Sequence, residues 1–122
     1  MMGDNEQDSP AFPSPDETVR NLGRHPDRET IAAVLRHHST ALHRDFGVSG
    51  LVLFGSAARG EAGPRSDIDL LVDFDAPPGL LRLGRLKAHL ESILGRRVDL
   101  ATRGSISPEL EERIRADGRH VL

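Results

Sequence analysis

The chain has 122 residues, a length typical of one domain, and a net charge of −3. It contains no cysteine, which excludes disulfides, thiol nucleophiles and cysteine-ligated zinc. No apolar stretch approaches the roughly 20 residues of a membrane-spanning helix, and residues 1–8 are acidic and lack the basic and apolar regions of a signal peptide. These features predict a cytoplasmic protein that does not enter a membrane.

The negative charge lies at the N-terminus. Residues 1–24 hold five acids and two arginines, whereas residues 25–122 hold fourteen acids and fourteen bases. This balance argues against a broad nucleic-acid-binding surface. Residues 1–24 are polar, contain three prolines and show no hydrophobic period, so we predict a flexible tail followed by one domain over residues 25–122.

From residue 27 onward, the hydrophobic pattern predicts alternating helices and strands. Asp27 is a candidate N-cap for a first helix, which follows an apolar stripe and ends at Gly47. A strand over residues 48–54 leads through a Gly-Ser turn into a short helix near residues 56–60. A loop then precedes a second strand over residues 66–74.

A long helix over residues 83–94 precedes a third strand over residues 96–101. Ser107 is a candidate N-cap for a last helix over residues 108–116, which has proline at its first position. This order of elements predicts an α/β (α+β) domain, in which a small sheet has helices packed mainly on one side.

Two aspartates head the second strand. Asp67 and Asp69 are two residues apart, so their side chains share one face of the strand, about 6.6 Å apart along it. Carboxylates so placed can hold a divalent cation such as Mg²⁺, which keeps several waters and needs few protein ligands. An Asp-x-Asp pair alone is more often a solvated strand end, so the interpretation depends on the features around it.

A third carboxylate and an anion-binding turn strengthen the interpretation. Asp99 lies between Val98 and Leu100 on the third predicted strand and is the candidate third metal ligand or the base that accepts a proton. Gly55 and Ser56 begin a helix, where free backbone N–H groups can bind a phosphate, although a lone Gly-Ser is more often a simple cap. In combination, these carboxylates and this turn are the smallest set of groups that can bind a nucleoside triphosphate together with its metal ions.

Two further residues have open roles. Arg59 can donate to phosphate oxygens through its planar guanidinium, or it can form an ion pair with Glu61 or with a site carboxylate, and the sequence does not separate these roles. Ser66, directly before the first aspartate, can bind a phosphate or cap the turn, and the sequence slightly favours the cap.

Three segments carry a resemblance to a known family. They are Gly-Ser-Ala-Ala-Arg-Gly over residues 55–60, Ser-Asp-Ile-Asp over residues 66–69, and Val-Asp-Leu over residues 98–100. Together they resemble the Gly-Ser…Asp-x-Asp signature of the polymerase-beta-like nucleotidyltransferases, and most closely the minimal nucleotidyltransferase (MNT) family. The resemblance covers about residues 27–122.

This resemblance implies a nucleotidyltransferase fold with a short mixed sheet. It also implies a site that uses Mg²⁺, with two ions expected, and ATP as the substrate. By motif, the carboxylates that hold Mg²⁺ and serve catalysis are Asp67, Asp69 and Asp99, and the residues at the triphosphate are Gly55, Ser56 and the nearby Arg59.

Members of the family commonly act as antitoxins beside a HEPN-domain toxin, and several transfer AMP from ATP to a toxin tyrosine. The resemblance therefore implies a protein adenylyltransferase with a HEPN toxin as partner. Since only about twenty residues follow the third strand, we expect the acceptor to bring its own complementary surface. The alternatives are an antitoxin that acts by binding alone and an adenylyltransferase for a small molecule such as an aminoglycoside. Self-association is compatible with each of them.

Overall fold

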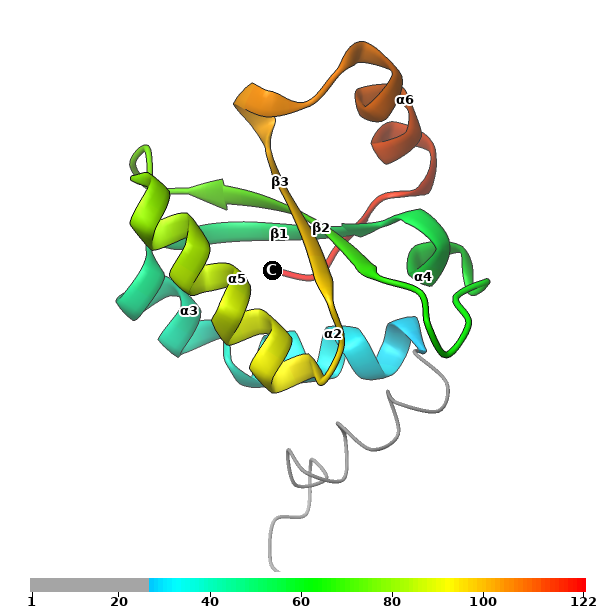
Figure 1. Cartoon of the computed structure of the whole chain (residues 1–122), viewed down its shortest axis with the longest axis horizontal. Helices are drawn as coiled ribbons and strands as arrows, with labels where there is room; N and C mark the ends of the chain where they lie inside the picture. Colours follow the sequence, from blue (N-terminus) through cyan, green and yellow to red (C-terminus); the bar gives the residue numbers. More distant parts are fainter. Residues whose placement is uncertain (1–26) are drawn as a thin grey trace, which may run out of the picture.

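A four-stranded mixed sheet in the order β3-β2-β1-β4 organises residues 27–122, which are the part of the chain described by the computed structural model (Figure 1). The strands are β1 (Val48–Phe54), β2 (Ile68–Phe74), β3 (Val98–Thr102) and β4 (Arg119–His120). The helices are α2 (Arg28–His37), α3 (Ser39–Phe46), α4 (Gly55–Arg59), α5 (Leu80–Leu94) and α6 (Pro108–Asp117), and a 3-10 turn, η2 (Arg103–Ser105), follows β3. The predicted α/β fold with a mixed sheet is confirmed, whereas the predicted tail over residues 1–24 lies outside the described residues.

The pairing of β2 with β3 fixes the register of the predicted carboxylates. β1 pairs antiparallel with β2 and with β4, whereas β2 and β3 are parallel and are joined by α5, as a parallel crossover requires. In this parallel pair Asp69 lies opposite Asp99. Because residues opposite each other share one face of a sheet, the two aspartates leave the sheet on the same side.

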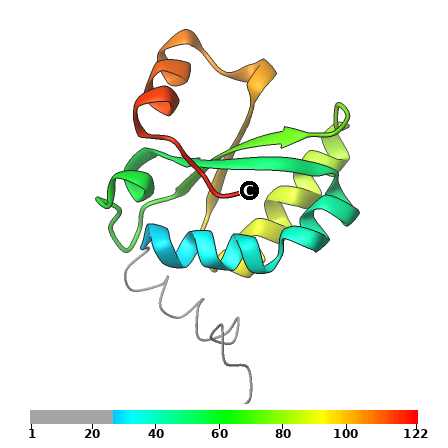
Figure 2. The ribbon, with the colours of Figure 1, turned by 180° about the vertical axis from the view of Figure 1, so that it is seen from behind.

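Helices α2, α3 and α5 cover one face of the sheet (Figure 2). Their apolar stripes bury the main core, in which each aliphatic side chain contributes about 1.5–3 kcal/mol of burial free energy. The largest side chains fully buried there are Ile31, Leu35, Leu42, Leu51, Leu53, Ile68, Leu70, Leu86, Leu90 and Leu94. The dense packing on this side gives the strands a rigid base.

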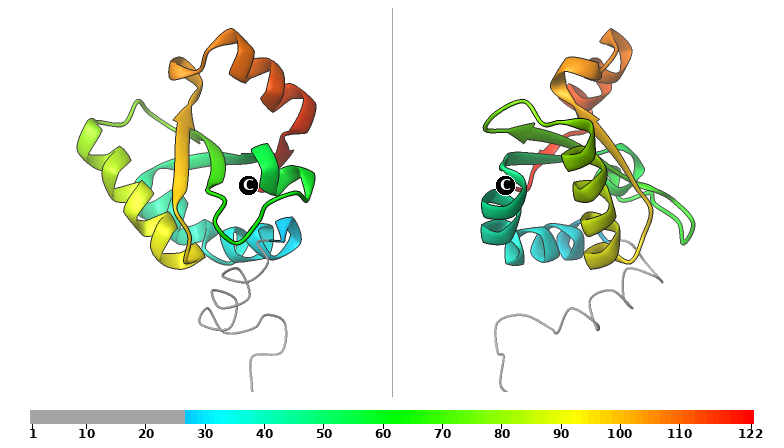
Figure 3. Two further views of the ribbon diagram at one scale, coloured as in Figure 1. Left: turned by 45° about the vertical axis from the view of Figure 1, so that its right-hand side comes forward. Right: turned by 60° about the vertical axis from the view of Figure 1, so that its left-hand side comes forward.

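The opposite face is covered only in part, by α6 (Figure 3). Leu71 of β2 and Val52 and Phe54 of β1 are buried there, in a smaller cluster that also contains Ala101, Ile106, Leu110 and Ile114. Because side chains alternate along a strand, Asp69 emerges on the same face as Leu71. The part of this face that α6 leaves open therefore contains two of the predicted carboxylates, Asp69 and Asp99.

The first predicted helix is two helices. α2 ends and α3 begins at His38, whose backbone (φ −98°, ψ 10°) departs from helical geometry while its N–H still reaches the carbonyls of Val34 and Leu35. Leu35 of α2 and Leu42 of α3 both enter the main core on either side of this break. None of the helices within residues 27–122 is long and apolar enough to cross a bilayer.

Candidate active site

A cleft of about 320 Å³ lies between the sheet, α4 and α6. This volume is at the lower end of the range of about 300–1,000 Å³ typical of small-molecule sites. Charged side chains from four elements, α4, β2, β3 and α6, line it together with apolar ones. The cleft is lined by Phe54, Gly55, Arg59, Asp69, Asp99, Ala101, Leu110, Arg113 and Asp117.

Asp69 and Asp99 form the acidic centre of the cleft. They occupy opposite positions of the parallel pair β2–β3, and both line the cleft. Burial, followed by the negative charges of Asp99 and Asp67, raises the pKa of Asp69 to about 6, while Arg113 and Arg59 act in the opposite direction. The carboxylates thus repel one another, and a cation between them would relieve that repulsion.

Gly55 brings the backbone of the α4 turn against the acidic centre. Its φ of +75° is a conformation that glycine adopts at little cost. A Cβ at this position would overlap the Oδ2 atom of Asp69. Glycine is therefore required at position 55 for two reasons: the turn that begins α4 needs a positive φ, and the Asp69 carboxylate leaves no room for a side chain.

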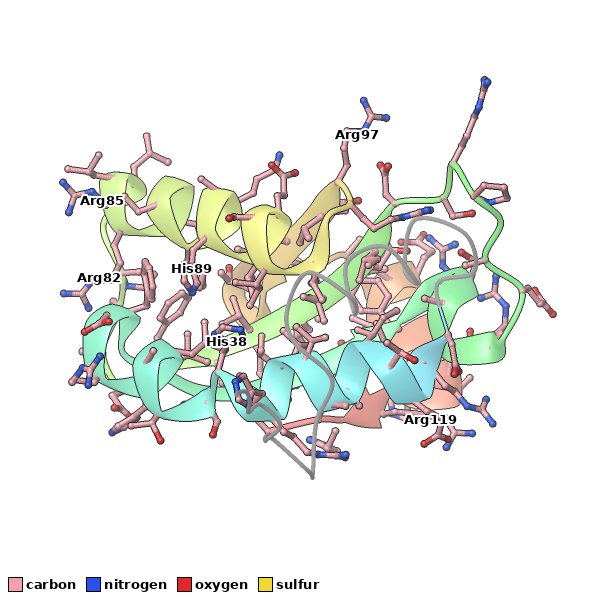
Figure 4. All side chains as sticks on the ribbon, turned by 90° about the horizontal axis from the view of Figure 1, so that it is seen from below. His38, Arg82, Arg85, His89, Arg97 and Arg119 are labelled. Carbon is pink, nitrogen blue, oxygen red and sulfur yellow. The ribbon has the colours of Figure 1, made fainter. Side chains whose placement is uncertain are left out.

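Asp67 points away from the cleft. Its Oδ1 atom is 3.3 Å from Nε of Arg97, and it lines a separate hollow together with that arginine. Figure 4 shows Arg97 projecting from the edge of the molecule. Two of the three predicted carboxylates therefore meet in the cleft, with Asp67 near enough for its charge to act on Asp69. Within residues 27–122, no three histidine or acidic side chains form a ready-made cation site.

Arg59 is held in ion pairs. Its Nε donates to Glu61 at 2.9 Å and one terminal nitrogen donates to Asp117 at 3.0 Å. Both hydrogen bonds raise the pKa of Arg59, which stays charged. Of the two roles that the sequence left open, the structure contains the ion pair, and it connects the end of α4 to the end of α6.

The two serines of the motifs both accept hydrogen bonds from backbone N–H groups in this structure. The hydroxyl of Ser66 accepts a hydrogen bond from the N–H of Gly63 at 2.9 Å, so it caps the loop before β2, and the serine lines the Asp67 hollow rather than the cleft. The carbonyl of Ser56 accepts from the N–H of Glu61 at 2.8 Å and closes α4. A phosphate contact by either hydroxyl remains a prediction.

Arg96 was missed by the sequence interpretation. It is buried, at 9% exposure, and its guanidinium donates to the carbonyl oxygens of Gly63, Pro64 and Ser66. These bonds fix the loop that delivers Asp67 and explain why β2 and β3 begin two residues later than predicted. In the sequence, Arg96 begins the predicted third strand beside a second arginine, Arg97, and no local signal distinguishes the buried arginine from the exposed one.

The sequence interpretation also did not place the last helix over the site. Leu110, Arg113 and Asp117 lie on one face of α6, three and four residues apart, and all three line the cleft. This spacing was visible in the sequence as a possible shared face. Which element that face covers depends on the path of the chain after β3, which periodicity does not reveal.

Known nucleotidyltransferases are similar to this chain in sequence and in fold. The family model described as nucleotidyltransferase domain matches residues 35–121. Protein adenylyltransferase MntA of Thermococcus cleftensis is 45% identical over 78 residues, which are 64% of this chain and 79% of that protein.

Two solved structures extend the similarity to the fold. A provisionally assigned minimal nucleotidyltransferase has a TM-score of 0.64 at 40% identity, over 76% of this chain and 94% of that one. A toxin–antitoxin complex with AMP-PNP has a TM-score of 0.60 at 27% identity, over 70% of this chain and 71% of that one. The chain therefore belongs to the nucleotidyltransferase domain family, as one of its minimal nucleotidyltransferase members, and it is a nucleotidyltransferase enzyme.

Proposed function

We propose that this enzyme transfers AMP from ATP to a hydroxyl group, specifically a tyrosine, of a partner HEPN-domain toxin, and so acts as an antitoxin. The observation that carries the proposal is the pair of carboxylates, Asp69 and Asp99, set in register beside the Gly55 turn. Two similarities support it: the relative named protein adenylyltransferase MntA and the toxin–antitoxin complex that contains an ATP analogue.

The donor atoms in and beside the cleft fit Mg²⁺. Carboxylate oxygens suit this ion, which proteins usually bind through one or two carboxylates together with substrate phosphates and waters. Asp69 and Asp99 supply such a pair. The raised pKa of Asp69 reflects burial first and then the repulsion from Asp99 and Asp67, which a cation would relieve. When bound, Mg²⁺ would neutralise charge on the triphosphate oxygens.

Asp67 can join this set at small cost. Its partner Arg97 has a side chain that is 82% exposed, and an exposed ion pair is worth less than about 1 kcal/mol. Rotation of Asp67 towards Asp69 would bring the three predicted carboxylates together. In this proposal, Asp67 and Asp69 hold the metal ions, with two expected, and Asp99 completes the site.

In the proposed reaction, the acceptor oxygen attacks the α-phosphorus of ATP. A new oxygen–phosphorus bond forms, the bond between the α-phosphorus and the bridging oxygen breaks, and pyrophosphate leaves. The hydroxyl proton passes to the carboxylate of Asp99, which is exposed at the cleft. Backbone N–H groups at Gly55 and Ser56 would donate to the triphosphate, as at other helix starts that follow a tight turn.

A protein acceptor suits the small cleft. At about 320 Å³, the cleft accommodates part of a nucleotide more readily than a nucleotide and a second small molecule together. An acceptor that brings its own surface needs only to present a hydroxyl at the open side, next to Asp99. This argument favours a protein over an aminoglycoside-like substrate.

The test is a transfer assay with ATP labelled at the α-phosphate, Mg²⁺ and the protein encoded by the adjacent gene. We expect label and an AMP mass increment on a tyrosine of that protein. The variant Asp67→Ala/Asp69→Ala should abolish transfer. The matched control is Asp73→Ala/Asp75→Ala, which removes the same Asp-x-Asp spacing at the other end of β2, outside the cleft.

The same variants distinguish catalysis from simple binding. If the Asp67→Ala/Asp69→Ala protein still protects cells from the toxin as well as the wild type does, neutralisation by contact replaces this proposal. Absence of label transfer by a wild-type protein that binds the toxin would have the same consequence. Ser56→Ala removes the hydroxyl and keeps the backbone N–H, so it should mainly weaken nucleotide binding if this hydroxyl also contacts the triphosphate.

A further inference from the structure

Arg113 is a cation of the cleft that has no acidic partner within the described part of the chain. It lines the cleft from α6, and among residues 27–122 no carboxylate lies within ion-pair distance of its guanidinium. It is nevertheless close enough to Asp69 for its charge to act on that carboxyl. An arginine in this position keeps its hydrogen-bond donors available for a ligand.

The other arginine of the cleft, Arg59, is already paired with two carboxylates. Arg59 donates to Glu61 and to Asp117 at 2.9 and 3.0 Å. A phosphate would have to displace at least one of these carboxylates to use the same donors, and it would meet the negative charge of the displaced group nearby. Binding a phosphate at Arg113 requires no such exchange.

The charge balance of the cleft also calls for a free cation. Its lining contains the carboxylates of Asp69 and Asp99, and a third, that of Asp117, which is paired with Arg59. Arg59 also pairs with Glu61, so it leaves the charge of Asp69 and Asp99 unbalanced. A phosphate chain would be repelled by this lining unless a positive group faced it. Arg113 supplies that group from the wall opposite the sheet.

We propose that Arg113 is a substrate-binding residue whose guanidinium binds the phosphate chain of the nucleoside triphosphate. The planar guanidinium suits this ligand because it can donate two parallel hydrogen bonds to one phosphate. The inference rests on the proposed function for its substrate class and gives Arg113 the role that the sequence offered to Arg59. In this arrangement Arg59 is a positioning residue that holds α6, and with it Arg113, over the cleft.

The test is calorimetric binding of ATP, AMP and inorganic tripolyphosphate to the full chain and to Arg113→Ala, Arg113→Lys and Arg115→Ala. Arg115 is the matched control because it lies on the same helix but pairs with Glu111 and Glu112 outside the cleft. We expect Arg113→Ala to weaken ATP and tripolyphosphate binding tenfold or more, and AMP binding less. Arg113→Lys should retain part of the affinity and Arg115→Ala all of it.

Two results would overturn the inference. One is equal ATP affinity for Arg113→Ala and the wild type, measured with both proteins folded as judged by their melting temperatures. The other is a loss of the same size for AMP and ATP, which would place Arg113 at the nucleoside or the α-phosphate. Either result can occur while AMP transfer proceeds. Conversely, the expected binding pattern without any transfer would refute the proposed function and leave Arg113 as a phosphate-binding residue.

Discussion

Asp69 on β2 and Asp99 on β3 stand opposite each other in a parallel strand pair, and both face the cleft beneath α6. Neither strand alone would create this site, because the two residues are brought together only by the crossover through α5. The arrangement concentrates negative charge on one face of the sheet, beside a turn whose glycine leaves no room for a side chain. Each feature leads to a measurable consequence.

Asp69→Asn should stabilise the metal-free protein at neutral pH while abolishing nucleotide transfer. The folded pKa of Asp69, about 6, exceeds the ordinary value of 3.8, so the folded state binds a proton more tightly than the unfolded state does. The ionised carboxylate therefore costs stability above pH 6, and that cost disappears as the pH falls towards 4. Since the side chain is partly exposed, we expect a gain of about 1 kcal/mol, after allowance for solvent screening.

Urea denaturation of wild type and Asp69→Asn, in the presence of a chelator, checks this sign. The difference in unfolding free energy should be largest near pH 7.5 and should shrink towards pH 4. A difference that stays constant across this range would show that Asp69 ionises normally in the folded protein.

Gly55→Ala should reduce nucleotide transfer more than Gly60→Ala does. Both glycines have positive φ, +75° and +77°, so alanine strains the backbone at either position by about 1–2 kcal/mol. Only at Gly55 would the new Cβ overlap the carboxylate of Asp69, whereas no atom lies within 4 Å of a Cβ at Gly60.

Melting temperatures and transfer rates of the two variants distinguish the effect of backbone strain from the effect of displacing the Asp69 carboxylate. The melting temperatures should fall by similar amounts, while the rate should fall steeply for Gly55→Ala alone. Similar rates for both variants would mean that the position of Asp69 next to the turn is unimportant for transfer.

Local sequence signals predicted most of the fold. β1 was predicted with its observed bounds, residues 48–54, because Gly47 and Gly55 both mark the ends of this strand with left-handed backbone geometry. Ser107 was predicted as an N-cap, and its side chain accepts a hydrogen bond from the N–H of Leu110. Such features depend on neighbouring residues, so one sequence is enough to find them.

The site was predictable only where a motif marked it. Asp69, Asp99 and Gly55 meet as the motifs implied, but the pairing of Asp67 with Arg97 joins residues 30 positions apart. The burial of Arg96 depends on a loop at a similar separation. A contact between residues so far apart produces no hydrophobic periodicity. From the sequence alone, Arg96 therefore cannot be distinguished from an exposed arginine.

Arg96→Met should destabilise the fold by about 2–3 kcal/mol, because three part-buried hydrogen bonds to carbonyl oxygens would lose their charged donor. Arg97→Met is the matched control on the adjacent residue, since the Arg97 side chain is 82% exposed and makes one weak ion pair. We expect its effect to be below about 0.5 kcal/mol.

Denaturant unfolding of both variants gives the comparison. If Arg96→Met and Arg97→Met lose similar stability, water replaces the three hydrogen bonds from Arg96 to the loop before β2, and these bonds make no net contribution to stability. If only Arg96→Met is destabilised, the loop before Asp67 is held in place by the arginine that precedes β3.

The packing of His38 against His89 predicts a loss of stability in mild acid, opposite in sign to the effect of Asp69. The rings are 6.2 Å apart, between α5 and the α2–α3 junction (Figure 4). Burial, followed by the charges of His37 and His89, lowers the pKa of His38 from 6.5. The folded state therefore resists protonation of His38, and stability should be complete above pH 6.5 and decline as the pH falls below it.

His89→Phe should reduce this loss. The Nε2 atom of His89 is buried without a hydrogen-bond partner among the described residues, and its ring already packs against Phe46 at 5.1 Å. Replacement by an apolar ring removes an unsatisfied polar atom and the charge of His89 that helps to lower the pKa of His38. We expect a gain of about 1 kcal/mol at pH 7.5 and a larger one at pH 5.5, measured by urea denaturation. An equal gain at both pH values would show that His89 does not influence the protonation of His38, and that the acid sensitivity comes from elsewhere in the fold.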